Sequence, residues 1–178
     1  MEKDYTSVDD LLKDRLHCTK ENKATVTLIN DLAGVLERGY LTRDEFIKIC
    51  EWKSPRNRRR FENNTDDDIK DVTNRAFSEQ NEMEKAFILC KLKGVRIPTA
   101  SAILSLVDPQ HYGVIDWRCW KVFYKFECVS SNPNGVNLTK EDWYLYLTVL
   151  RTYAARFKTS VRMVELTLFE SHQSGWVS

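Results

Sequence analysis

A single carboxylate, Asp116, stands at the end of the short apolar run "YGVI" and directly before a predicted helix. Aspartate in this position accepts hydrogen bonds from the free N–H groups of the first helical turn, and the helix dipole favours its charged form. We therefore expect Asp116 to cap the helix and to be ionised at neutral pH. A charged carboxylate in a cleft can stabilise positive charge on a reacting group, whereas a purely structural cap is the alternative.

A turn with the sequence "LKGVRIPT" precedes this carboxylate and joins helices expected over 80–92 and 98–107. Gly94 can adopt the positive φ that such a turn needs, and a proline fits the first turn of the second helix. We expect N–H groups around Thr99 and Ala100 to point outward. Free N–H groups at a helix N-terminus attract phosphate, so the turn is a candidate phosphate contact.

The segment "EWKSPRNRRRFENN" carries five basic residues within eight positions: Lys53, Arg56, Arg58, Arg59 and Arg60. On one continuous helix, Lys53, Arg56 and Arg60 would share a face. Basic groups beside aromatic residues are typical of surfaces that bind a phosphate backbone, and Trp52 could wall a pocket for an extruded base. The alternative is a solvated charged surface, partly neutralised by the aspartates at 66–68.

Further candidates flank Asp116 in the sequence. Arg118 is close enough to pair with Asp116 or to contact phosphate, and Trp117 could either stack on a base or belong to the core. His111 and Tyr112 precede Asp116 and could line the same cleft. A lone histidine is weak support for acid–base chemistry.

The elements that must position these residues all read as helices. Threonines with an acidic residue three positions later indicate helix starts: Thr42–Glu45, Thr65–Asp68 and Thr139–Asp142. Ser54 followed by proline predicts another start, and Gly39 predicts a helix end. Apolar residues recur at helical intervals. The expected helices are 8–17, 24–38, 43–52, 55–62, 66–77, 80–92, 98–107, 117–128, 140–157 and 161–171.

Only "YGVID" has a strand-like pattern, and it is too short to build a sheet, so we predict an all-α fold. With 178 residues, the chain fits one helical domain over 1–178, or two closely packed helical lobes with a cleft between them. The turn-rich stretch at 130–137 predicts an exposed loop or soft joint. Trp176 could pack back onto the body or remain mobile.

Composition narrows the possible functions. Hydrophobic residues make up 42% of the chain, charged residues 30%, and the net charge is +1, so attraction to nucleic acid must come from a local patch. The five cysteines form no C-x-x-C pair: Cys18, Cys50, Cys90, Cys119 and Cys128. We expect no disulfide framework, no metal and no other cofactor. Because the sequence shows no secretory signal and no apolar run of about 20 residues, we expect a cytoplasmic, nucleoid or nuclear protein that is neither secreted nor in a membrane. We also expect it to be a monomer.

Residues 92–121 resemble the helix-hairpin-helix superfamily of base-excision DNA glycosylases. The resemblance rests on "L-x-G-V-x-x-x-T-A-x-x-I-L" from Leu92, followed by "V-I-D-x-R" around Asp116. It implies a two-lobed all-helical fold, a hairpin at 80–107 that binds the DNA backbone, and Asp116 as the catalytic acid. Cleavage of the bond between base and deoxyribose passes through an oxocarbenium-like state, which a nearby carboxylate stabilises.

Three departures from the family pattern refine these expectations. The second hairpin glycine is Arg96, which hinders close backbone approach to a phosphate but offers a guanidinium in its place. Pro98 occupies the position where lyase-competent members carry a nucleophilic lysine, so the resemblance implies hydrolysis by water without lyase activity. The cysteine cluster that binds an iron–sulfur centre in some members is absent.

Three functions remain open at this point. The first is a DNA glycosylase that releases a damaged or modified base, with Asp116 as catalytic residue and duplex DNA as partner. Its nucleic-acid contacts would be Gly94, Arg96, Thr99, Lys53, Arg56, Arg60 and Arg118, and its pocket candidates Trp52, His111, Tyr112 and Trp117. The second is a binding module that has the same fold without chemistry. The third is a helical protein-interaction domain with no affinity for DNA.

Overall fold

The computed structural model describes residues 4–175 and 177, and within these residues it contains helices and no strand. The prediction of an all-α fold is therefore confirmed. Trp176 lies outside the described residues. The helices are α1 (Val8–Arg15), α2 (Lys23–Asp31), α3 (Val35–Arg38), α4 (Arg43–Lys53), α5 (Arg58–Phe61), α6 (Asp66–Ser78), α7 (Glu82–Leu89), α8 (Ile97–Val107), α9 (Trp117–Lys125), α10 (Lys140–Phe157) and α11 (Val161–Gln173), with a 3-10 turn η1 (Pro55–Asn57) between α4 and α5.

The helix starts follow the expected capping chemistry. In α4, α6 and α10 a threonine hydroxyl accepts a hydrogen bond from the third helical N–H, and the acidic side chain at that third position bonds back to the threonine N–H. These reciprocal bonds confirm all three predicted capping boxes. Gly39 ends α3 with φ of 81°, as expected for a helix stop.

Two predicted helices are divided in the structure. The helix expected over 24–38 was predicted wrongly as one piece, because the chain turns between Leu32 and Gly34 and resumes as α3. Gly34 has φ of 86°, a left-handed conformation that interrupts the helical hydrogen bonds. The helix expected over 55–62 is split into η1 and α5. Because the chain changes direction between α4, η1 and α5, the basic side chains at 53–60 do not lie along one face of a single helix.

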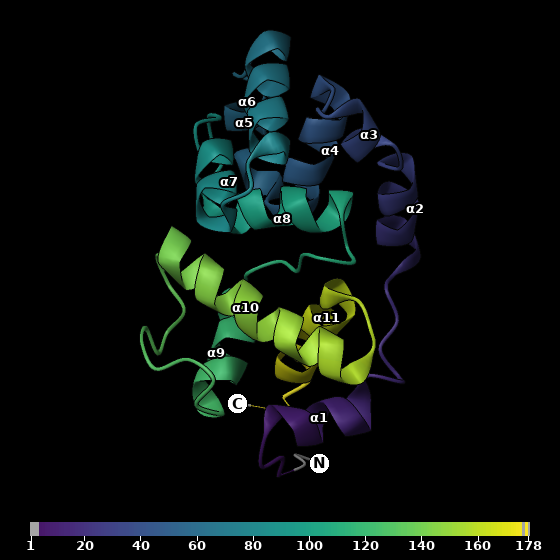
Figure 1. The fold of residues 1–178 in the computed structure, drawn as a ribbon, viewed down its shortest axis with the longest axis vertical. Helices are drawn as coiled ribbons and strands as arrows, with labels where there is room; N and C mark the ends of the chain where they lie inside the picture. Colours follow the sequence, from purple (N-terminus) through teal and green to yellow (C-terminus); the bar gives the residue numbers. More distant parts are fainter. Residues whose placement is uncertain (1–3, 176, 178) are drawn as a thin grey trace.

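Figure 1 shows how the helices are arranged. Helices α2 to α8 gather in the upper half of the picture, and α1 with α9, α10 and α11 in the lower half. After α8 the chain makes a turn at residues 108–111, crosses between the two halves as an extended segment, residues 112–116, and enters α9. Buried apolar side chains from both halves form one core, whose largest members are Trp120, Trp143, Tyr146, Phe46, Phe61 and Phe123.

Among the described residues no helix is both long and apolar enough to cross a membrane.

Candidate active site

Asp116 stands at the end of an extended segment, residues 112–116, that belongs to no sheet. Its backbone groups are instead bonded by side chains of α8, α10 and α11. Ser105 Oγ donates to Tyr112 O (3.1 Å), Tyr146 Oη donates to Val114 O (2.9 Å), Ile115 N–H donates to Ser101 Oγ (3.0 Å) and Val114 N–H donates to Glu165 Oε2 (3.3 Å). Because buried backbone groups are costly to leave unpaired, these bonds fix the path of the chain that presents Asp116.

Glu165 belongs to a buried ion network beneath this segment. Its carboxylate pairs with Arg162, whose Nε also lies 2.7 Å from Glu21 Oε2. Glu165 is 2% exposed and Arg162 is 5% exposed. A buried charge is tolerated only when it is paired and hydrogen-bonded, so the network and the extended segment depend on one another.

The carboxylate of Asp116 has three partners. One oxygen accepts the N–H of Arg118 (3.0 Å) and lies 3.4 Å from the guanidinium of the same residue. The other lies 2.9 Å from Lys53 Nζ, at the end of α4. Burial acts to raise the pKa of Asp116, but the Lys53 ammonium and the Arg118 contacts outweigh it, and the pKa is lowered from its ordinary value. Asp116 therefore caps α9 and is ionised at neutral pH, as expected.

Replacing Lys53 with methionine is expected to raise the pKa of Asp116. The variant removes the ammonium, while burial and the Arg118 contacts remain. Carbon-13 NMR titration of the aspartate carboxyl carbons measures the shift directly. Lys48→Met is the matched control, because Lys48 is an exposed residue of the same helix. Equal titration curves for the two variants would contradict the role assigned to Lys53.

The turn between α7 and α8 packs directly against the arginine-rich α5. Gly94 has φ of 86°, and a Cβ placed there would come within 2.9 Å of both Arg60 and Phe61. The side chain of Asn64 bonds the N–H of Lys93 (2.7 Å) and its carbonyl (3.0 Å). The glycine is thus required by a positive φ and by close packing within the protein. This packing places the turn beside the basic segment.

The free N–H groups of this turn lie earlier in the chain than the sequence suggested, before Pro98 rather than at Thr99 and Ala100. The N–H groups of Thr99 and Ala100 both donate to Arg96 O at 2.8 Å, so the expectation that they point outward was wrong. Within residues 94–100, the N–H groups of Gly94, Arg96 and Ile97 have no acceptor in the described part of the chain. The shift arises because α8 starts at Ile97, one residue before Pro98.

A cavity of about 1170 Å³ opens beside Asp116. Its volume is slightly above the usual range for small-molecule sites, about 300–1,000 Å³. The cavity is lined by the end of α4 and the turn after it (Lys53, Ser54, Asn57, Arg60), by α7 (Phe87, Cys90), by residues 94–99, by the start of α9 (Asp116, Trp117), and by the loop leading into α10 (Gly135, Asn137, Leu138, Thr139, Lys140, Glu141). Asp116 lines this cavity, and 13% of its side chain is exposed.

Several arginines near the cavity have no acidic partner. Arg56, Arg59, Arg60 and Arg96 are exposed and form no ion pair with any described residue. The aspartates at 66–68 form no ion pair with these arginines: Asp66 pairs with Arg43, and Asp68 bonds back to the Thr65 N–H in the capping box of α6. Arg60 and Arg96 line the cavity, whereas Arg56 does not.

Three of the pocket candidates lie elsewhere. Trp52 donates its indole N–H to Thr25 Oγ1 (2.9 Å) and does not line the cavity. His111 is exposed and pairs with Asp108. Tyr112 is buried, bonds Lys85 and Glu82 through its hydroxyl, and lines a separate small cavity instead. Of the four candidates Trp117 alone lines the large cavity.

Sequence reasoning missed part of the cavity wall. Phe87 in α7 is 48% exposed and carries Lys140 Nζ 4.9 Å above its ring. Asn57 and Asn137 add side-chain amides to the lining, and Asn137 adopts a positive φ of 52°. The turn-rich loop at 130–137, expected to be an exposed joint, thus supplies one side of the cavity. Its glycine and asparagine content marked it only as a turn.

The described residues contain no group of three or more potential metal ligands from His, Cys, Asp and Glu. Their cysteines form no disulfide. No protein-family model, curated protein or solved structure matches the chain. What the site does must therefore be argued from its own residues and geometry.

Proposed function

We propose that the protein is a monofunctional DNA glycosylase that hydrolyses the bond between a damaged or modified base and its deoxyribose. The observation that carries this proposal is an ionised Asp116 at the edge of a cavity large enough for a nucleoside. The turn at 94–97 and Asp116 line the same cavity, so a ligand bound there could contact both.

The chemistry assigned to Asp116 is electrostatic. Departure of the base leaves positive charge on the sugar ring, and a carboxylate close to that ring lowers the energy of the charged state. The lowered pKa of Asp116 keeps the carboxylate charged before the reaction begins. The bond between sugar C1′ and the base nitrogen breaks, the oxygen of water bonds to C1′, and the proton that this water loses balances the charge of the departing base. Lys53 and Arg118 act as positioning residues, because they orient the carboxylate and hold it in the charged form.

The duplex is held by contacts to its phosphates. The N–H groups of Arg96 and Ile97 and the guanidinium groups of Arg60 and Arg96 share one rim of the cavity. Unpaired arginines and free N–H groups are the usual partners of phosphate oxygens. Because the net charge of the chain is only +1, this local group must supply the attraction.

The double variant Arg60→Gln, Arg96→Gln is expected to weaken binding of an undamaged duplex and to lower its salt dependence. Loss of two phosphate contacts lowers the slope of log affinity against log salt by about 2. Fluorescence anisotropy of a labelled duplex, measured at salt concentrations from about 50 to about 200 mM, gives this slope. Arg75→Gln, on α6 and away from the cavity, is the control. Equal slopes for the double variant and the control would show that Arg60 and Arg96 do not contact the DNA phosphates.

The absence of an amine at Pro98 supports hydrolysis by water. The nearest amine to the carboxylate is Lys53 Nζ, and it is engaged with Asp116. Borohydride reduction during the reaction traps any imine between an amine and the sugar aldehyde. The proposal predicts no trapped adduct. An adduct that forms with the wild type and not with Lys53→Arg would contradict hydrolysis by water and would indicate that the Lys53 amine attacks the sugar.

A panel of duplexes, each with one altered base, tests the proposed function. Abasic-site formation is measured after alkali treatment for the wild type and for Asp116→Asn. We expect the wild type to release at least one of the bases and the variant to leave that duplex intact.

A non-catalytic DNA-binding module is the second candidate. It is favoured by the ion pairs of Asp116 with Lys53 and Arg118, which already balance the carboxylate charge. Under this reading Asp116→Asn would bind DNA as the wild type does, and no duplex of the panel would lose a base.

A further inference from the structure

Three basic side chains gather around Trp117 at the start of α9. The guanidinium carbon of Arg118 lies 4.5 Å from the centre of an indole ring of Trp117, and Lys121 Nζ lies 5.1 Å from it. The imidazole of His172, from α11, meets the indole edge-on with a centroid distance of 5.2 Å. Trp117 is 39% exposed and lines the large cavity, whereas the three basic residues that surround it are not part of the cavity lining.

The basic cluster carries more positive charge than nearby acids balance. Asp116 is the one acidic group that pairs with it among the described residues, and its other oxygen already binds Lys53. Burial, followed by the charges of Lys121 and Arg118, lowers the pKa of His172, while Asp116 acts weakly in the opposite direction. Lys121 has no acidic partner in the described part of the chain. The positive charges of the cluster repel one another, and a bound anion would reduce this repulsion.

We infer that Arg118, Lys121 and His172 form a second phosphodiester-binding site, which holds nucleic-acid backbone on the α9 side of the cavity. The N–H groups of Arg96 and Ile97 and the guanidinium of Arg96 hold the backbone on the other side. The inference shares the nucleic-acid ligand of the proposed function but does not depend on base release.

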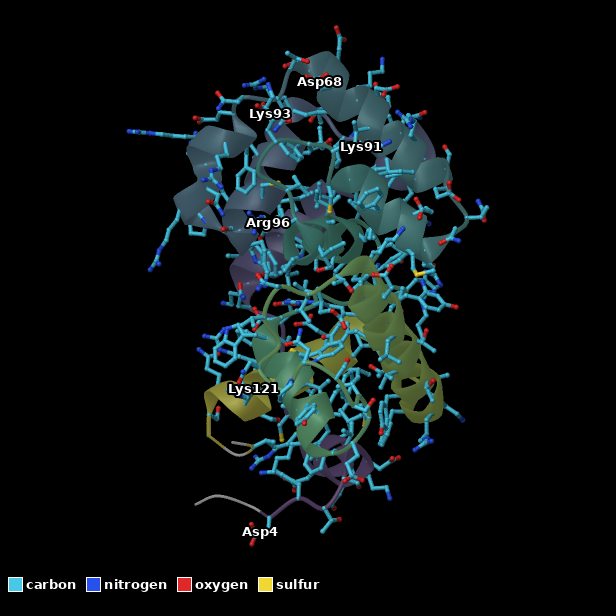
Figure 2. All side chains as sticks on the ribbon, turned by 90° about the vertical axis from the view of Figure 1, so that its left-hand side faces the viewer. Asp4, Asp68, Lys91, Lys93, Arg96 and Lys121 are labelled. Carbon is cyan, nitrogen blue, oxygen red and sulfur yellow. The ribbon has the colours of Figure 1, made fainter. Side chains whose placement is uncertain are left out.

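The placement of the two sites supports this reading. Figure 2 shows Arg96 on the upper half of the molecule and Lys121 on the lower half, both on the face turned toward the viewer. Asp116 lies between them in the chain, and the cavity reaches from the Arg96 turn to Trp117. A strand that contacts both sites would pass the carboxylate. The indole of Trp117 contacts the guanidinium of Arg118 and the ammonium of Lys121, which holds both charged groups on this side of the molecule.

The first test compares Lys121→Gln with Lys158→Gln, an exposed lysine at the end of α10. Binding of an undamaged duplex is measured by fluorescence anisotropy at several salt concentrations. Lys121→Gln is expected to bind several-fold more weakly, with the slope of log affinity against log salt lower by about 1, while Lys158→Gln keeps the wild-type slope.

The second test follows the ring signals of His172 by NMR during pH titration, with and without the duplex. A bound phosphate favours the charged imidazole, so the pKa of His172 is expected to rise when DNA is added. Duplex affinity should then increase as pH falls, and His172→Gln should remove that dependence. The signals of exposed His17 provide the internal reference.

Three results would overturn the inference. One is wild-type affinity and salt slope in Lys121→Gln, and another is a His172 pKa that DNA leaves unchanged. The third is a shift of equal size with inorganic phosphate alone, combined with unaltered duplex binding by Lys121→Gln, which would assign the cluster to free phosphate. Because every readout uses undamaged DNA, failure of base release by Asp116 leaves these tests intact.

Discussion

Asp116→Asn should lower the rate of base release by at least about a hundredfold while duplex affinity changes little. Loss of one group that stabilises transition-state charge typically costs about 10²- to 10³-fold in rate. Asparagine is nearly isosteric with aspartate and caps helices equally well, so the bond to the Arg118 N–H and the start of α9 are retained. The substitution thus removes charge with little change in shape. Single-turnover rates with excess protein measure the effect.

Two controls separate chemistry from folding and binding. The thermal unfolding midpoint of Asp116→Asn shows whether the fold is intact, and anisotropy with an uncleaved duplex shows whether binding is intact. Asp108→Asn is the matched substitution, since Asp108 is an aspartate at the end of α8 that pairs with His111 outside the cavity. Equal rates for Asp116→Asn and Asp108→Asn would rule out the catalytic role of Asp116.

Glu165→Ala should lower the free energy of unfolding by about 3–5 kcal/mol. Removal of one member of a buried ion pair leaves the other charge uncompensated, and losses of this size follow. Here Arg162 keeps Glu21 as a partner but loses Glu165, and the N–H of Val114 loses its acceptor. Urea unfolding followed by tryptophan fluorescence measures the change.

Glu165→Gln is the informative companion to Glu165→Ala. Glutamine keeps an oxygen for the N–H of Val114 and fills the same volume, so it should destabilise the protein less than alanine. If Glu165 also positions Asp116 through the extended segment, folded Glu165→Gln should release bases faster than folded Glu165→Ala. Unfolding free energies that match the wild type in both variants would show that the buried network does not hold the segment.

Much of the fold follows from local signals in the sequence. The threonine capping boxes and the helical spacing of apolar residues act within one or two turns, so they can be recognised without the rest of the chain. The break at Gly34 escaped the same reasoning, because a glycine inside an apolar helical pattern is compatible with either a continuous or a divided helix.

The candidate site depends on contacts that no local pattern encodes. Asp116 was recognisable as a helix cap, but its partner Lys53 lies 63 residues away in the sequence. Phe87 and Asn137 reach the cavity from α7 and from the loop before α10, and their residue types alone carry no signal of that placement. Trp52 illustrates the converse: this aromatic beside basic residues is partly buried against the core, with the guanidinium of Arg162 5.3 Å from the centre of its ring.

Hydrolytic release of a free base at Asp116 is most directly tested by mass spectrometry of the reaction products. With a duplex selected from the panel, we expect one free base per abasic site, an unbroken strand before alkali treatment, and neither product with Asp116→Asn. Intact DNA from every duplex, or the same free base from Asp116→Asn at the wild-type rate, would contradict a catalytic carboxylate at this position.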